Sequence, residues 1–89
     1  MLIFIVHGKW KTKLTKAVVD DATSRLAQMT KEGIKWHGQY WTLGRYDIVS
    51  IAEAKDEKTL MKALIKWSDI LSTETLVAVP REEAIKLIE

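Results

Sequence analysis

Apolar and polar residues recur along this chain with a period that changes from that of a strand to that of a helix and back. Residues 2–8 open with an unbroken apolar run, Leu2 to Val6, which is typical of a central strand covered on both faces. From residue 12 to residue 32 the apolar positions recur every three or four residues, which predicts a helix with one apolar side. Gly33 suits the position just beyond a helix end, so we expect this helix to stop there.

A β-hairpin is predicted next. Residues 34–43 and 46–54 both carry strand-like patterns, and Gly44 with Arg45 between them predicts a two-residue turn. Gly44 reaches the positive φ that the first central position of such a turn requires. The resulting register pairs Leu43 with Tyr46, Thr42 with Asp47, Trp41 with Ile48, Tyr40 with Val49, Gly38 with Ile51, His37 with Ala52 and Trp36 with Glu53.

A second helix and a fourth strand complete the predicted core. Asp56 is suited to cap a helix over 57–71, which has a clear apolar stripe. Residues 73–79 are typical of a strand, which Pro80 ends. A short helix over 81–89 follows, and its apolar residues are expected to seal an edge of the core.

The predicted order of elements, βαββαβ plus a C-terminal helix, is that of a ferredoxin-like α+β fold. If both crossovers are right-handed, the four strands form an antiparallel sheet in the order four, one, three, two, with both long helices on one face. We expect a single domain over 1–89, because 89 residues leave no room for a second core.

This layout leaves one face of the sheet without cover. The helices cover the other face, yet strands 2–8 and 46–54 carry large apolar residues on both faces. Soluble monomers rarely expose an apolar patch of this size. We therefore expect the chain to pair with itself, as a homodimer or a larger oligomer joined through the open sheet face.

Composition narrows the possible functions. The chain has no cysteine, which excludes disulfides, thiolate zinc sites and cysteine nucleophiles. Its net charge of +2 is too small to indicate nucleic-acid binding, and its first apolar run is too short to span a membrane. We expect a cytoplasmic protein without a cofactor. The absence of asparagine and the abundance of Lys and Glu favour a thermophilic source.

The hairpin turn carries a family resemblance. Its residues Gly44-Arg45-Tyr46-Asp47 resemble the Gly-x-Tyr-Asp signature of the GYD-domain family. Two later segments also resemble motifs of that family: Glu53-Ala54 followed by Asp56, and Thr73-Glu74-Thr75-Leu76. The resemblance covers nearly the whole chain and implies a small ferredoxin-like protein of the dimeric α/β-barrel type. It implies no catalytic residues.

A weaker similarity connects the hairpin and the acidic helix cap to the ligand-binding module of Lrp/AsnC-type regulators. Since no helix-turn-helix precedes the module in this sequence, the similarity implies a free-standing module that binds a small effector molecule.

Three groups in or beside the central strands are candidates for acid–base chemistry: His7, His37 and Asp47. Histidine exchanges protons near neutral pH by its own pKa, whereas the pKa of Asp47 would have to be raised by burial. The alternative interpretation is structural, with Asp47 accepting hydrogen bonds from Thr42, Thr75 or nearby backbone groups. The spacing of these residues gives no support for a metal site, so we expect no bound metal.

Aromatic residues are numerous, with four Trp and two Tyr in the chain. Most are expected in the core or at an interface, where aromatic side chains contribute most, and some could line a pocket. The candidates for contact with a small-molecule ligand are Tyr40, Trp41, Tyr46 and Glu53.

Three functions therefore compete. The first is a homodimeric binding or structural module without catalysis, which we prefer because no reactive constellation assembles in the sequence. The second is the effector-binding module. The third is a cofactor-free enzyme similar to the isomerases and monooxygenases of the dimeric α/β-barrel group. Clustering of His7, His37 and Asp47 around a cavity would favour the enzyme, and their dispersal would favour the first function.

Overall fold

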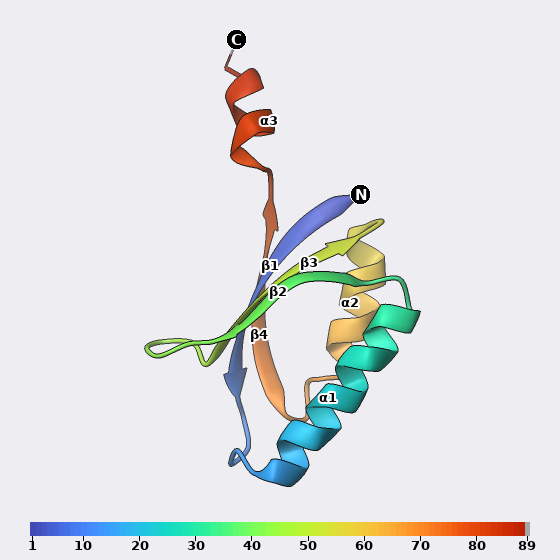
Figure 1. Cartoon of the computed structure of the whole chain (residues 1–89), viewed down its shortest axis with the longest axis vertical. Helices are drawn as coiled ribbons and strands as arrows, with labels where there is room; N and C mark the ends of the chain where they lie inside the picture. Colours follow the sequence, from blue (N-terminus) through green and yellow to red (C-terminus); the bar gives the residue numbers. More distant parts are fainter. Residues whose placement is uncertain (89) are drawn as a thin grey trace.

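The computed structural model describes residues 1–88, in which two long helices cover one face of a four-stranded sheet (Figure 1). The strand order is β2-β3-β1-β4 with every neighbouring pair antiparallel, which confirms the predicted topology. Glu89, the last residue of the predicted C-terminal helix, lies outside the described residues. The elements are β1 (Leu2–Trp10), α1 (Lys16–Lys31), β2 (Lys35–Trp41), β3 (Ile48–Ala54), α2 (Glu57–Ile65), β4 (Leu71–Ala78) and α3 (Arg81–Lys86).

The hydrophobic core lies between the sheet and the two long helices. Burial alternates along β1 and β3, so that every second side chain of these strands points toward the helices. From the sheet come Phe4, Val6, Ala52 and Ala54, and from the helices and the segments after them come Ala22, Met29, Ile34, Leu60, Ala63, Trp67, Ile70 and Leu71.

The opposite face of the sheet, here called the open face, has no helix over it (Figure 1). The residues of β1 and β3 that alternate with the core positions lie on this face, and they are mostly aliphatic. Leu76 of β4, which pairs with Ile5 of β1, remains 47% exposed there. Ile3, Val49 and Ile51 are further aliphatic side chains on this face.

Helix α1 begins later than predicted, at Lys16 rather than at residue 12. The hydroxyl of Thr15 accepts the backbone N–H of Val18 at 3.2 Å and so caps the helix. Leu14 consequently lies outside the helix and is exposed instead of joining the core. At the other end Gly33 has a φ of 96°, which confirms its predicted place just beyond the helix.

Helix α2 ends earlier than predicted, at Ile65 rather than at residue 71. The chain continues in tight turns, in which Trp67 donates its backbone N–H to the carbonyl of Leu64 at 2.9 Å. These turns use fewer residues than a continued helix would, so β4 begins at Leu71 instead of residue 73.

The hairpin loop spans residues 42–47 and is longer than the two-residue turn that we predicted. Gly44 does have the expected positive φ, 114°. Thr42 donates its backbone N–H to the carbonyl of Asp47 and its hydroxyl to the carbonyl of Tyr46, both at 2.8 Å. Tyr46 of this loop contacts His7 of β1 and Glu74 of β4.

A β-bulge interrupts the pairing of β2 with β3 between Trp36 and Gly38. Because His37 is the extra residue, Trp36 lies opposite Ala52 and points to the core side of the sheet. The predicted pairs of His37 with Ala52 and of Trp36 with Glu53 are therefore wrong. Between the bulge and the loop the register is as predicted.

Helix α3 projects beyond the end of β4, away from the body of the molecule (Figure 1). None of its residues is buried, and Ile85 and Leu87 at its end are exposed. The expectation that this helix seals an edge of its own core is therefore wrong. The chain turns away at Val79 and Pro80, so α3 does not fold back over the sheet.

One ionic cluster connects α1 to the segment after α2. The guanidinium of Arg25 makes two hydrogen bonds of 2.8 Å to the carboxylate of Asp69 and a third contact of 2.8 Å to Asp21. It also donates to the Lys66 carbonyl at 3.0 Å and lies 5.6 Å from the ring centroid of Trp67. We call this group the Arg25 clamp, since it holds Trp67 in place.

The Arg25 clamp predicts a loss of stability in acid. Its hydrogen bonds lower the pKa of Asp69 from 3.8 to about 2. The stabilisation is therefore complete above the unfolded value of 3.8 and is lost as the pH falls through the folded value of about 2. We expect Asp69→Asn to be less stable than the wild type at neutral pH, and the difference to shrink as the pH falls from 3.8 through about 2. Urea unfolding at a series of pH values measures this, and a difference that does not change with pH would contradict it.

Candidate functional site

Asp47, at the end of the hairpin loop, is hydrogen-bonded to the backbone of β1. Its carboxylate accepts the backbone N–H of Trp10 at 2.8 Å, and its own backbone N–H donates to the carbonyl of Gly8 at 2.8 Å. These two bonds fasten the hairpin to the last residues of β1. Of the partners named in the structural interpretation of Asp47, which were Thr42, Thr75 and backbone groups, the carboxylate bonds to a backbone group, the Trp10 N–H.

Tyr46 joins a polar cluster on the open face. Its hydroxyl donates to the carboxylate of Glu74 at 2.6 Å, and this hydrogen bond raises the pKa of Tyr46 above its ordinary value. The ring of His7 lies edge-on to Tyr46 with 4.6 Å between centroids, and the Arg45 guanidinium lies 5.7 Å from the Tyr46 ring centroid. Within residues 1–88, the Nδ1 atom of His7 is buried and has no hydrogen-bond partner.

His37 forms a separate pair with Glu53, with 2.9 Å between the imidazole Nε2 and the carboxylate. This hydrogen bond lowers the pKa of Glu53 below its ordinary value. Strand β3 lies between the strands of His7 and His37, which puts about 10 Å between those strands. His7, His37 and Asp47 thus lie in three different environments, and no set of three His, Asp or Glu side chains in residues 1–88 is placed to hold a metal ion.

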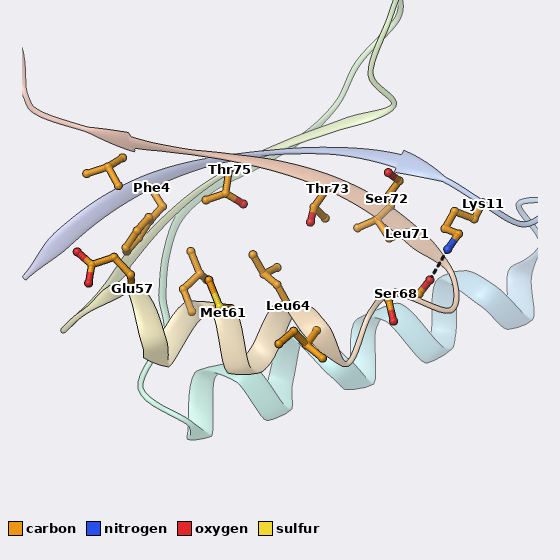
Figure 2. A pocket seen from close by; sticks show the side chains of 13 residues that line it. Phe4, Lys11, Glu57, Met61, Leu64, Ser68, Leu71, Ser72, Thr73 and Thr75 are labelled. Atoms are coloured by element: carbon orange, nitrogen blue, oxygen red, sulfur yellow. Dashed lines mark hydrogen bonds between the residues drawn. The ribbon is translucent and has the colours of Figure 1, made fainter.

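A cleft lies on the other face of the sheet, between α2 and β4, and we call it the α2–β4 cleft (Figure 2). Its volume is about 540 Å³. Figure 2 shows Met61 and Leu64 of α2 facing Thr73 and Thr75 of β4 across it, with Phe4 at one end.

The chemistry of the α2–β4 cleft is that of a binding site for an apolar molecule. Its walls are aliphatic, with hydroxyl groups of Thr73 and Thr75 along β4. The Lys11 ammonium at one end donates to the carbonyl of Ser68 at 2.7 Å, as drawn in Figure 2. Glu57 lies at the opposite end. No histidine lines the cleft, so it lacks a group that exchanges protons near neutral pH.

Sequence reasoning did not find the α2–β4 cleft. A signal was present in α2, where Met61 and Ile65 widen the apolar stripe beyond the face that contacts the sheet. These two residues are 59% and 64% exposed in the structure. An apolar helical stripe wider than its sheet contact indicates that something else covers the remainder.

The remaining candidate residues are divided between the two faces. Trp41 lines a smaller hollow between α1 and the sheet, whereas Tyr40 pairs with Val49 and its side chain lies on the open face. Tyr46 lines a polar hollow of about 280 Å³ on the open face, together with Lys9 and Glu74. The candidate residues therefore do not form one site.

Comparison with known families and solved structures agrees with the fold described above. The family model described as the GYD domain matches residues 4–88. Among curated proteins, none matches the sequence. Within the described residues, no helix has both the length and the hydrophobicity to cross a membrane.

Several solved structures share the fold. The protein named FFRP-DM1 has a TM-score of 0.60 at 18% identity, over 89% of this chain and 100% of that one. The leucine response regulatory protein LrpA of Mycobacterium tuberculosis gives 0.60 at 18%, over 88% of this chain and 50% of that one. At3g17210 of Arabidopsis thaliana gives 0.59 at 7%, over 90% and 95%. The chain spans only half the length of LrpA, and identities this low show a common fold alone.

Proposed function

The chain belongs to the GYD-domain family, and on that premise we propose that it is a homodimeric binding or structural module without catalysis. One observation carries the proposal: the open face of the sheet is aliphatic and has no cover in a single copy of the chain. Ile5, Val49 and Ile51 lie side by side on it, in the two central strands. A second copy placed against this face would remove these side chains from water.

The polar side chains of the open face are compatible with a second copy of the chain packed against this face. They lie in two groups, Tyr46 with Glu74 at one place and His37 with Glu53 at another. Aliphatic residues surrounded by paired polar groups are the usual composition of a protein interface. The resemblance to the dimeric α/β-barrel proteins supports the same assembly.

Light scattering on a size-exclusion column tests the proposal. A chain of 10.2 kDa that pairs with itself is expected to elute with a mass of about 20 kDa, or a multiple of it, at micromolar concentration. A single species with the mass of one chain would contradict the proposal, since the open face would then remain exposed to water in the folded protein.

A second candidate function is the binding of a small effector, and the α2–β4 cleft favours it. Its volume of about 540 Å³ falls in the range of ligand sites, and its few hydroxyl groups would orient an otherwise apolar ligand. LrpA, which shares the fold, is named for a response to leucine. Apolar amino acids are therefore the first probes to use.

Calorimetric titration with leucine, methionine and phenylalanine tests the effector function. We expect at least one of them to bind, and Ile65→Glu to weaken that binding about tenfold, because it puts a charge into the apolar wall of the cleft. Lys62→Glu is the matched control, since it changes charge on the same helix outside the cleft lining. Absence of binding by the wild type, or equal binding by both variants, would contradict the effector function.

Cofactor-free catalysis has the least support among the three functions. It requires His7, His37 and Asp47 to converge on one substrate. Their separate environments, and the backbone hydrogen bond of the Asp47 carboxylate, favour structural roles for them.

A further inference from the structure

Helix α3 buries none of its residues against the rest of the described chain. It has six residues, Arg81–Lys86, and among residues 1–88 no side chain caps its start. Figure 1 shows it beyond the end of β4, away from the other helices. Isolated helices shorter than about 12 residues are marginal in water, and most helical stability in proteins comes from packing an apolar side. Helix α3 therefore lacks the packing that usually stabilises so short a helix.

Residues 81–88 have one apolar side. Ile88 lies just after α3, and its backbone N–H donates to the carbonyl of Ile85 at 3.2 Å, so the helical turns continue to it. Spacings of three and four residues put Ala84, Ile85 and Ile88 on the same side. Ile85 and Ile88 are 39% and 87% exposed. Apolar side chains at such spacings are the anchors with which an amphipathic helix docks in an apolar groove.

The α2–β4 cleft is an apolar groove of similar length. Three of the apolar side chains that line it, Met61, Ile65 and Val77, are 59%, 64% and 57% exposed. At about 1.5 Å per residue, the nine residues of α2 extend over about 13 Å, and residues 81–88 over about 12 Å. The apolar side of residues 81–88 therefore matches the cleft in both chemistry and length.

Charges at the ends of the two surfaces are complementary. Glu57 and Lys11 lie at opposite ends of the cleft (Figure 2). Arg81 precedes Ala84 and Ile85 by three and four residues, so it lies on the apolar side of α3 at its start. Within residues 1–88, neither Glu57 nor Arg81 forms an ion pair. An exposed ion pair between them would add little affinity, but it would set the direction in which α3 lies in the cleft.

We propose that α3 of one copy of the chain docks in the α2–β4 cleft of a second copy, with Ile85 and Ile88 in the cleft and Arg81 beside Glu57. The helix does not reach its own cleft, because it points away from the body of the molecule (Figure 1). Each copy offers one α3 and one cleft, so the contact is heterologous and joins copies into rings or chains. An effector in the cleft would exclude α3, so these two occupants compete.

The second copy belongs to a different open-face pair, meaning two copies joined through their open faces, and this part rests on the proposed function. The cleft and the open face lie on opposite sides of the sheet, so the clefts of such a pair point outward. Only Val79 and Pro80 separate β4 from α3, and two extended residues span about 7 Å. Stacked sheets are about 10 Å apart, so α3 does not reach the far side of its partner's sheet. Docking of α3 therefore joins open-face pairs into larger assemblies.

Sedimentation equilibrium of the full chain tests the proposal. Because the contact is small, we expect open-face pairs to associate with a Kd on the order of 100 µM, so the wild-type mass rises above that of a pair as the concentration increases. Ile85→Asp is expected to weaken this step at least about tenfold and to leave the pairs intact, since it puts a charge into the apolar cleft. Lys86→Asp, on the polar side of α3, is the matched control and is expected to associate like the wild type.

The outcomes separate this proposal from the pairing of open faces. A wild type that remains a pair at every concentration, or an Ile85→Asp variant that associates as the wild type does, would overturn the docking of α3 and leave the pairing intact. If single chains associate instead of pairs, and Ile85→Asp prevents it, the docking holds and the pairing fails. A single-chain mass at every concentration contradicts both.

Mixing two variants tests the location. Ile65→Asp makes the same kind of change in the wall of the cleft, and it is expected to prevent the association of pairs as Ile85→Asp does. Each variant retains the surface that the other has lost. We therefore expect a mixture to form the larger species again, through α3 of the Ile65→Asp chain and the cleft of the Ile85→Asp chain. A mixture that remains at the mass of a pair would show that α3 docks elsewhere, and it would overturn the proposal.

Discussion

Replacing Ile51 by aspartate is expected to convert the proposed dimer into monomers. Ile51 lies in β3 on the open face, with Ile5 of β1 directly opposite it. In a dimer paired through this face, the new carboxylate would be buried among aliphatic side chains without a counter-charge. Burying an unpaired charge costs several kcal/mol, so we expect the dissociation constant to rise at least about 100-fold.

The matched control is Ile65→Asp, the same substitution at an apolar residue that is 64% exposed on the opposite side of the molecule. It is expected to leave the dissociation constant within about twofold. Sedimentation equilibrium over a range of concentrations measures both variants, and circular dichroism checks that each remains folded. If Ile51→Asp remains a dimer while Ile65→Asp dissociates, the interface lies on the helix side of the sheet instead.

Leu60→Ala is expected to have the largest effect on folding stability. Leu60 is 2% exposed and is among the largest fully buried side chains of the described residues. Truncating a buried leucine removes its hydrophobic contribution and leaves a cavity, so we expect a loss of about 3 kcal/mol in the free energy of unfolding. Small domains are stable by about 5–15 kcal/mol, so this one change removes a large part of the total.

Met61→Ala, one residue along the same helix, is the comparison for Leu60→Ala. Met61 is 59% exposed in the α2–β4 cleft, and we expect its truncation to cost about 0.5 kcal/mol or less. Urea unfolding at one fixed protein concentration measures both, because self-association makes stability depend on concentration. A cost for Met61→Ala as large as that for Leu60→Ala would show that the cleft is filled, for example by another copy of the chain.

The fold was predictable because its determinants are local or periodic. The apolar run from Leu2 to Val6 marks a central strand, and the alternation in β3 gives its two faces. Gly33 and Gly44 both adopt the positive φ that their predicted positions require. Asp56 accepts the backbone N–H of Thr59 at 2.8 Å, as expected of a helix cap.

The errors arose where contacts between distant residues decide the local structure. The hairpin loop contains Tyr46, which bonds to Glu74, 28 residues away in the sequence. The position of His37 depends on a bulge beside Gly38, and a glycine inside a strand is compatible with a bulge without specifying one. Patterns in a single sequence do not show contacts between distant residues, although the wide apolar stripe of α2 did carry a signal of the α2–β4 cleft.

The bulge in β2 also affects how the molecule avoids aggregation. As an outer strand, β2 presents unpaired backbone N–H and C=O groups that a second strand could join, and repeated joining of this kind builds fibres. The extra residue at His37 disrupts the regular spacing of these groups, and it brings an imidazole and the Glu53 carboxylate to the margin of the sheet. A strand docking there would have to bury both groups. Growth of a sheet along the β2 edge is therefore disfavoured.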